Sequence, residues 1–314
     1  MHRIHPAPKR WIATTFALLA LALSIPGYAK VLHEERSVYT RIIVEDERNL
    51  RCLKFTLVRE NSRQTCMDRN NPQRLVFDYA KMTLSALLLK PDPERILIIG
   101  LGGGTLPMAL RDILPSAVID TVEIDEAVVR VAKRFFDFAE DDQNRVYVQD
   151  ARVFGKRAAL RGEQYDLIIL DAFDGEYIPE HLMTVEFLSE MRGLLSDDGV
   201  LVANTFASSK LYDYESATYA EAFGGFLNFR LPTSGNRVIL VPQANLDIDA
   251  RTPLDRETLR ANADALKAPM APYDMPLKRY VSTLLSLSEQ KPDWNSRIRP
   301  LTDQFSPANV LQSQ

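Results

Sequence analysis

The sequence predicts an α/β protein in which a doubly wound, mostly parallel sheet follows a small N-terminal antiparallel β-domain. Short β-rich runs follow one another from Val31 to Phe77. Strand-like runs then alternate with helical patterns up to residue 245, which favours a parallel sheet with helices on both faces. Residues 246–314 indicate C-terminal amphipathic helices and an extended tail. With 46% hydrophobic residues, the chain can bury a sizeable core.

Residues 1–29 stand apart from this plan and indicate export. A basic start is followed by an apolar run, Trp11 to Ile25, and small residues end the segment at Ala29. This order is typical of a secretory signal peptide, and the run is shorter than the roughly 20 apolar residues that a membrane span needs. We expect cleavage after Ala29, or else an uncleaved anchor in the inner membrane. In both cases the body of the protein lies in the periplasm.

Residues 30–90 are expected to form the β-domain and a helix that links it to the next domain. A strand at Leu50–Val58 is followed by a polar turn, so a hairpin there would bring Cys52 and Cys66 onto neighbouring strands. Because disulfides persist in exported proteins, we expect a bridge between these cysteines, with two free thiols as the alternative. The linking helix is expected from Tyr79 to Leu89, before two prolines.

Residues 91–245 contain a nucleotide-binding βαβ pattern. A strand at Ile96–Ile99 enters a glycine-rich loop, a helix follows, and a second strand, Val118–Val122, ends in Glu123. Glycines let a ligand approach the backbone N–H groups, and a carboxylate about 20 residues further on can accept both hydroxyls of a ribose. Thr105 stands where a dinucleotide fingerprint needs its third glycine. The loop glycines are Gly100, Gly102, Gly103 and Gly104, a G-x-G-x-G spacing typical of S-adenosylmethionine-dependent transferases.

The later strands also end in acidic residues. We expect strands at 146–148, 167–170 and 200–204, helices at 126–136 and 184–195, and a terminal hairpin at 226–231 and 237–241. Ligands of such sheets bind at the carboxyl ends of the strands. A single Asp there is more often a helix cap, but a succession of them favours a nucleoside-type ligand. The succession is Glu123 with Asp125, Asp150 before Ala151, and Asp171 with Asp174.

From about Val31 to Gln314 the chain resembles the spermidine synthase (polyamine aminopropyltransferase) family. That family has a small N-terminal β-domain followed by a Rossmann domain of the class I S-adenosylmethionine-dependent methyltransferase type. The order and spacing of several motifs carry the resemblance. They are Ser37-x-Tyr39, Tyr79-x-x-Met82, the glycine loop, Val122-Glu123-Ile124-Asp125, Asp150-Ala151, Leu170-Asp171-x-x-Asp174 and Leu301-Thr302-Asp303.

The resemblance implies a donor, S-adenosylmethionine or its decarboxylated form, and a small-molecule amine as the acceptor. It implies that Glu123 holds the ribose and that Asp150 holds the adenine. It also implies that Asp171 orients the amine and takes its proton, while Asp174 and Tyr79 help to hold a polyamine. The full implied set is Gly100, Gly102, Gly104, Glu123, Asp125, Asp150 and Ala151 for the cofactor, Asp171 and Asp174 for catalysis, and Tyr39, Tyr79 and Asp303 for the substrate.

Five residues depart from the family pattern, and they concern the amine half of the site. Gly103 stands where the family has an Asp that grips the aminopropyl ammonium, and Thr40 stands where it has a Gln. Ala80-Lys81 replaces His-Glu, and Gly175 replaces a proline. Lys81 would place a positive charge near the expected polyamine, unless its side chain points outward. We therefore expect an intact cofactor half and an eroded polyamine half.

Three functions stay open on this basis. An aminopropyltransferase-type enzyme is favoured by the family resemblance. A methyltransferase on the same scaffold is supported by Gly103, and an exported, non-catalytic protein that binds a nucleoside or polyamine is supported by the N-terminal segment. The formal net charge of −4 argues against nucleic-acid binding. The spacing of the histidines indicates no metal site, and homodimerisation stays open.

Overall fold

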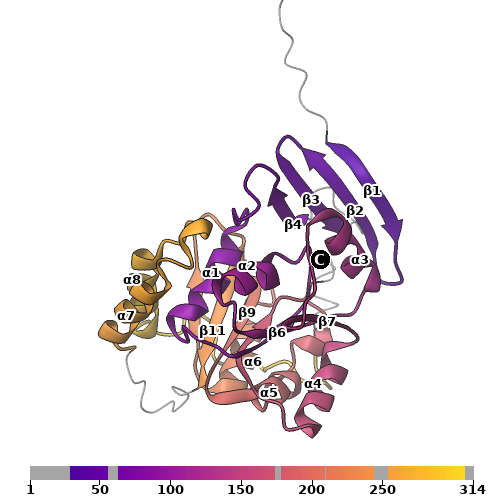
Figure 1. Cartoon of the computed structure of the whole chain (residues 1–314). Helices are drawn as coiled ribbons and strands as arrows, with labels where there is room; N and C mark the ends of the chain where they lie inside the picture. Colours follow the sequence, from indigo (N-terminus) through magenta and orange to yellow (C-terminus); the bar gives the residue numbers. More distant parts are fainter. Residues whose placement is uncertain (1–28, 56–62, 174–177, 209, 244–253, 308–314) are drawn as a thin grey trace, which may run out of the picture.

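The chain forms two sheets among the residues that the structure describes, which are 29–55, 63–173, 178–208, 210–243 and 254–307. Figure 1, a cartoon of the computed structural model, shows a small antiparallel sheet next to a larger sheet that is flanked by helices. This architecture confirms the predicted fold class. The segment interpreted as a signal or anchor lies, except for Ala29, outside the described residues.

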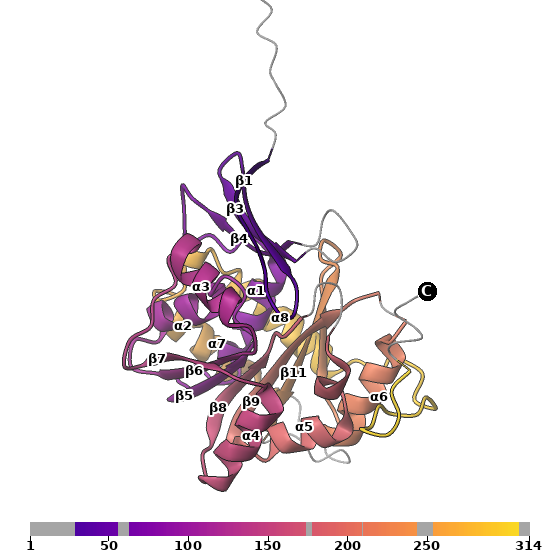
Figure 2. The same cartoon turned by 90° about the vertical axis from the view of Figure 1, so that its right-hand side faces the viewer.

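The N-terminal sheet packs its apolar face against a helix of the larger unit. Its strands are β1 (Lys30–Arg36), β2 (Arg41–Glu47), β3 (Leu50–Phe55) and β4 (Arg63–Asp68), in that order. Residues on one face, such as Val44 and Leu53, are buried because side chains alternate along a strand. They share a cluster with Val128 and Phe136, in and just after α3 (Glu126–Phe135). This packing holds the small sheet beside α3 (Figure 2).

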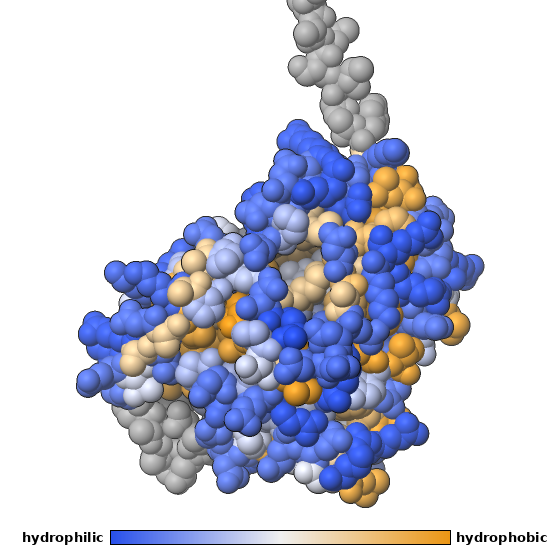
Figure 3. All heavy atoms as spheres, viewed as in Figure 1, coloured by the Kyte–Doolittle hydropathy of each residue, from blue (hydrophilic) through white to orange (hydrophobic). Residues whose placement is uncertain are grey.

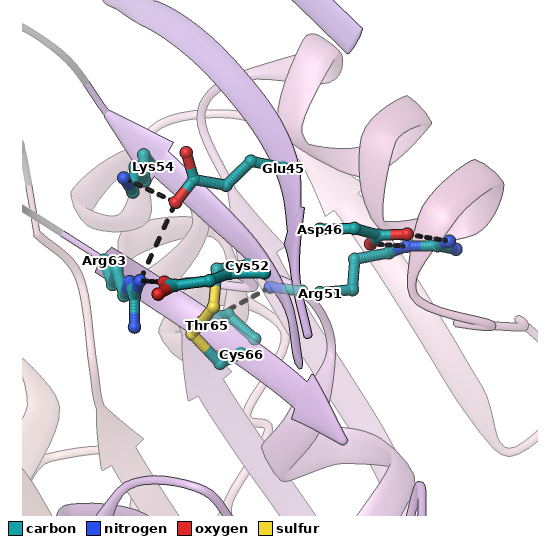
Figure 4. The surroundings of a disulfide bond; sticks show 10 residues. Glu45, Asp46, Arg51, Cys52, Lys54, Arg63, Thr65 and Cys66 are labelled. Atoms are coloured by element: carbon teal, nitrogen blue, oxygen red, sulfur yellow. Dashed lines mark hydrogen bonds and ion pairs between the residues drawn. A yellow bond between two sulfur atoms is a disulfide. The ribbon is translucent and has the colours of Figure 1, made fainter. Parts of the chain in front are cut away.

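The expected disulfide joins the last two strands of this sheet. Cys52 on β3 lies directly opposite Cys66 on β4 in the antiparallel register. Their Cα atoms are 4.1 Å apart, and the two sulfur atoms are bonded (Figure 4).

The larger sheet is mostly parallel and changes its winding direction beside its central strand. The chain runs outward from β5 to β6 and β7, then returns to β8 on the other side of β5, and β11 pairs with β9 in the antiparallel sense. Ligands of such sheets bind where the direction changes. The strands are β5 (Arg95–Ile99), β6 (Val118–Glu123), β7 (Asn144–Val148), β8 (Tyr165–Leu170), β9 (Leu195–Phe206), β10 (Leu227–Arg230) and β11 (Asn236–Pro242), in the order β10-β11-β9-β8-β5-β6-β7.

Helices cover both faces of this sheet. On β5, Ile96 and Ile98 belong to the apolar cluster of one face, whereas Leu97 and Ile99 belong to that of the other. The first cluster includes residues of α1 (Asp78–Leu84), α2 (Thr105–Ile113), α7 (Arg256–Leu266) and α8 (Leu277–Ser288). The second includes residues of α4 (Ala151–Leu160), α5 (Val185–Arg192) and α6 (Tyr212–Phe223). Short 3-10 turns occur at Ser85–Leu88, which continues α1, and at Glu180–Leu182 and Ala271–Tyr273.

Two helices, α4 and α6, were not expected from the sequence. Gly155 lowers the helix propensity of α4, but a Cβ there would lie 2.6 Å from Met191 Cε, so the glycine lets α5 approach. Helix α6 lacks a clear apolar stripe because its buried residues include Glu215 and Ser216. Both accept hydrogen bonds at 2.7 Å from the fully buried Arg237 on β11.

The face of the molecule shown in Figure 3 is mostly hydrophilic, with separate apolar patches. No helix within the described part of the chain reaches the length and apolar character needed to cross a membrane.

Candidate active site

A cavity of about 270 Å³ lies at the carboxyl ends of β5, β6 and β8. The strand ends supply the glycine loop and the acidic residues, and the small sheet supplies part of the wall. The structure therefore brings together most residues that the sequence analysis singled out. Those that line the cavity are Tyr39, Tyr79, Gly100, Gly102, Glu123, Asp125, Asp150, Ala151 and Asp171. Asp174 and Gly175 lie outside the described residues.

The glycine loop is shaped by close approaches that only glycine allows. Gly100 has a φ of +101°, and a Cβ there would lie 2.4 Å from the backbone oxygen of Asp171. Gly104 has a φ of +81°, and its Cβ would lie 2.6 Å from the ring of Phe138. Gly100 thus lets the ends of β5 and β8 meet at the cavity. Gly104, expected to contact the cofactor, does not line the cavity, and its role is to let Phe138 pack.

Glu123 is held in place by the backbone around it. One carboxylate oxygen accepts a hydrogen bond from the Leu101 N–H and the other from the Asp125 N–H, each at 3.0 Å. Burial raises the pKa of Glu123, while these two N–H groups act in the opposite direction. Each oxygen of a carboxylate has a second lone pair. Glu123 can therefore fix the loop and accept ligand hydroxyls at the same time.

Asp125 and Asp150 cap helices and also face the cavity. Asp125 Oδ1 accepts the Ala127 N–H at 2.9 Å at the start of α3, and its buried Oδ2 has no hydrogen-bond partner within the described residues. Asp150 Oδ1 accepts the Val153 N–H at 2.9 Å at the start of α4. Each of these two residues can therefore cap a helix and bind a ligand at the same time.

His181 lines the cavity next to Asp150. Its Nε2 lies 3.2 Å from Asp150 Oδ2, and it comes from the 3-10 turn at Glu180–Leu182. From the sequence, His181 could line the mouth of the pocket, but its position two residues after Pro179 favours a helix start. The structure shows that it both lines the cavity and belongs to the 3-10 turn.

Asp171, at the end of β8, lines the cavity, with one carboxylate oxygen held by Asn204 and the other near the Tyr79 hydroxyl. Asn204 on β9 donates to Oδ1 at 2.8 Å, and Asn204 Oδ1 in turn accepts from Asn236 at 3.0 Å. The Tyr79 hydroxyl lies 3.5 Å from Oδ2, which is long for an O–H···O hydrogen bond. Burial raises the pKa of Asp171 to about 7. Burial and the Asp171 charge raise the pKa of Tyr79.

Of the two orientations expected for Lys81, the structure shows the outward one. Lys81 Nζ donates to the backbone oxygen of Asp274 at 2.9 Å, next to the C-terminal helices. Lys81 is not among the residues that line the cavity, whereas Thr40 and the half-exposed Tyr39 are. The side chain of Lys81 therefore points away from the expected polyamine.

Asp303, expected to contact the substrate, lies away from the cavity. Both of its carboxylate oxygens accept from Arg152, at 2.8 and 2.7 Å, and Oδ1 also accepts from Thr184 at 2.8 Å. The hydrogen bond from Arg152 lowers the pKa of Asp303. Asp303 does not line the cavity; in this position it ties the C-terminal tail to α4 and α5.

Thr65 and Asn204 are among the polar residues around the cavity that the sequence analysis missed. Thr65 on β4 lines the cavity, and its hydroxyl accepts the Gly103 N–H at 3.0 Å. Asn204 supports Asp171, and its position at a strand end could have identified it. Nothing in the sequence places Thr65 there, because it comes from the other sheet. Within the described residues, no group of three or more His, Cys, Asp or Glu side chains could hold a metal ion.

Comparisons with known proteins agree with this arrangement. The Spermine/spermidine synthase domain family matches residues 77–232. A polyamine aminopropyltransferase of Vibrio vulnificus (strain CMCP6) is 48% identical over 306 residues, which make up 96% of this chain and 98% of that protein.

Two solved structures share the fold. A probable spermidine synthase from Corynebacterium glutamicum ATCC 13032 aligns with a TM-score of 0.58 at 20% identity, over 85% of this chain and 98% of that chain. Human methyltransferase-like protein 13 in complex with SAH aligns with a TM-score of 0.51 at 23% identity, over 74% of this chain and 96% of that chain.

Proposed function

Because the chain belongs to the spermidine synthase family of polyamine aminopropyltransferases and is thus a transferase, we propose that it alkylates a small amine with a sulfonium donor in the cavity described above. The donor is decarboxylated S-adenosylmethionine. The observation that carries the proposal is the shared cavity: Asp171, whose pKa is raised to about 7, faces the same space as Glu123 and the glycine loop.

The nucleoside half of the cavity fits the adenosyl group of such a donor. Glu123 is oriented by two backbone N–H groups and can accept the ribose hydroxyls. Asp125 Oδ2 is a buried acceptor without a partner among the described residues, which favours a ligand that donates to it. Asp150 and the first N–H of α4, at Ala151, can read the adenine edge, since the first N–H groups of a helix have no partner within it.

Asp171 provides the base that an amine nucleophile needs. An ammonium has no lone pair, so the acceptor must lose a proton before or while it attacks carbon. The nitrogen lone pair forms the new C–N bond, the C–S bond breaks, and its electron pair stays on sulfur as a neutral thioether. Asp171 Oδ2 accepts the proton, while Asn204 keeps the carboxylate in place through Oδ1. Alignment of the two substrates supplies the rest of the rate.

We also propose that the protein is exported, with residues 1–29 as a cleaved signal peptide. The basic and apolar pattern of that segment supports export, and so does the Cys52–Cys66 disulfide, because such bonds persist outside the cytoplasm. Cell fractionation followed by mass determination tests this. A periplasmic protein that begins at Lys30 is expected. An intact N-terminus on a cytosolic protein would rule export out, and an intact membrane-bound form would indicate an anchor.

The donor is identified by calorimetry of the purified protein with three ligands. We expect decarboxylated S-adenosylmethionine and methylthioadenosine to bind and S-adenosylmethionine to bind more weakly. A preference for S-adenosylmethionine would favour a methyltransferase. Binding of a nucleoside without turnover of any amine would favour the non-catalytic alternative.

Catalysis is tested with Asp171→Asn, using the exposed Asp197→Asn as the matched control. We expect Asp171→Asn to lower turnover about 100-fold, the scale of a lost general base, with methylthioadenosine affinity nearly unchanged. Equal turnover of the two variants would contradict the role of Asp171.

A further inference from the structure

Thr65 sits where the two sheets meet at the cavity. It is buried, it lines the cavity, and it stands next to Cys66, whose disulfide ties β4 to β3 (Figure 4). Its hydroxyl oxygen accepts the backbone N–H of Gly103 at 3.0 Å. Thr65 thus connects the N-terminal sheet to the glycine loop through a polar group.

The side chain of Thr65 fills the space that a side chain at position 103 would need. A Cβ on Gly103 would lie 2.6 Å from Thr65 Cγ2 and 3.2 Å from the ring of Phe136. A Cβ on Gly102 would lie 2.7 Å from Thr65 Oγ1. The missing acid at position 103 and the presence of Thr65 are therefore two parts of one packing arrangement.

The hydroxyl of Thr65 can still bind a ligand in this position. A hydroxyl has two acceptor lone pairs and one donor proton, and the Gly103 N–H uses one lone pair. The glycine loop beside Thr65 connects the nucleoside half of the proposed site to the catalytic half. Its Leu101 N–H donates to Glu123, and a Cβ at Gly100 would lie 2.4 Å from the backbone oxygen of Asp171. A ligand chain that extended from the ribose toward Asp171 would therefore lie along this loop.

We propose that Thr65 determines donor specificity: its hydroxyl accepts a hydrogen bond from the ammonium at the end of the transferred chain, in place of a carboxylate at position 103. The inference rests on the proposed function. A neutral acceptor binds an ammonium less strongly than a carboxylate does. The protein therefore still prefers a donor with an aminopropyl group, but it binds that group less tightly than a carboxylate at position 103 would.

The first test separates the transferred chain from the nucleoside. Methylthioadenosine lacks the aminopropyl group, and decarboxylated S-adenosylmethionine has it, so the ratio of their affinities reports on that group. We expect Thr65→Val, which keeps the shape but loses the hydroxyl, to lower this ratio about tenfold, equivalent to about 1.4 kcal/mol. Thr65→Ser should restore it. Thr83→Val, a buried threonine away from the cavity, is the matched control.

The second test uses the packing. Gly103→Asp alone should lower the melting temperature and weaken both ligands, because its Cβ meets Thr65. Thr65→Ala combined with Gly103→Asp removes that contact, so it should restore folding and raise the affinity ratio above that of the wild type.

An unchanged ratio in Thr65→Val, with both ligands bound by the wild type, would overturn the role of Thr65 and leave the proposed function intact. If Gly103→Asp has the same effect whether residue 65 is Thr or Ala, the packing argument is overturned. If the wild type binds neither ligand, the proposed function fails and this inference fails with it.

Discussion

Glu123 and Asp150 each stabilise the backbone around the cavity while they face it. Glu123 fixes the glycine loop through Leu101, and Asp150 caps α4 through Val153. Asp171 differs from them, because its support comes from the side chain of Asn204 on the neighbouring strand. Substitution of Glu123 or Asp150 will therefore change local structure and ligand binding together, whereas Asp171 can be changed with less effect on the backbone.

Glu123→Gln should weaken methylthioadenosine binding at least tenfold. A hydrogen bond to a charged acceptor contributes about 1.5–3 kcal/mol. The amide NH2 of Gln would also face the Leu101 or the Asp125 N–H, and two donors cannot form a hydrogen bond. Calorimetry measures the effect, with Glu257→Gln on the exposed start of α7 as the control. Unchanged affinity would remove Glu123 from the nucleoside site.

Asp171 should make the stability of the protein depend on pH. Its folded-state pKa of about 7 lies above the ordinary value of 3.8, so between these values the folded state binds more protons than the unfolded state. Stability then falls as pH rises through this range, by at most about 4 kcal/mol. Asp171→Asn should therefore raise the melting temperature more at pH 8 than at pH 4. An equal change at both pH values would contradict the raised pKa.

The same ionisation should appear in catalysis. The carboxylate form of Asp171 is the base, so kcat/KM should rise with pH and level off above about pH 7. The measurement is a pH profile of kcat/KM for the amine at a saturating donor concentration. A profile that is flat across this range would indicate that another group takes the proton.

Strand-end residues of the site were predictable, and residues from other elements were not. Glu123, Asp150 and Asp171 follow parallel strands, whose carboxyl ends meet at one edge of the sheet. Thr65 reaches the cavity only because the small sheet packs on α3, a tertiary contact that no local pattern encodes. Asp303 matched a motif, yet the contact with Arg152 holds it away from the cavity.

At the scale of elements, β4 connects the disulfide to the cavity. Cys66 and Thr65 are adjacent on this strand, and Thr65 lies opposite Leu53 of β3 in the register. The disulfide therefore holds the strand that carries Thr65 against its neighbour. Among the helices, α4 and α6 escaped prediction because a packing glycine and buried polar groups obscure their periodicity.

Reduction of the disulfide should destabilise the protein and weaken donor binding. Cys52 and Cys66 are 14 residues apart, and closing a loop of about that length stabilises a fold by about 3 kcal/mol in the chain-entropy model. Urea unfolding with and without reductant measures the first effect, and calorimetry with decarboxylated S-adenosylmethionine measures the second. A double Cys→Ser variant with the wild-type unfolding midpoint would show that the bridge adds no stability.

At the scale of the whole molecule, Arg152 is one of the residues that join the C-terminal tail to the sheet unit. Arg152 on α4 bonds to Glu190 on α5 at 3.0 Å and to Asp303 in the tail at 2.7 Å. Thr184, the cap of α5, bonds to the same carboxylate. Arg152 thus links α4, α5 and the C-terminal tail at a place away from the residues that line the cavity.

Asp303→Asn should lower stability by about 1 kcal/mol, because the ion pair is partly exposed to solvent. The KM for the amine should stay within about twofold of the wild type. Thermal unfolding and steady-state kinetics test the two statements. A large rise in KM at unchanged stability would restore the substrate role that the family resemblance implies for Asp303.

The contact between Thr65 and Gly103 also restricts how this chain can evolve. A mutation that introduces an acid at position 103 meets Thr65 Cγ2 at 2.6 Å, so it is harmful while that threonine remains. A smaller residue at position 65 must therefore arise first. On its own, that substitution loses the proposed hydrogen bond between the Thr65 hydroxyl and the ligand. The two substitutions are therefore epistatic, and a lineage with this pair of residues is separated from the acidic loop by a less fit intermediate.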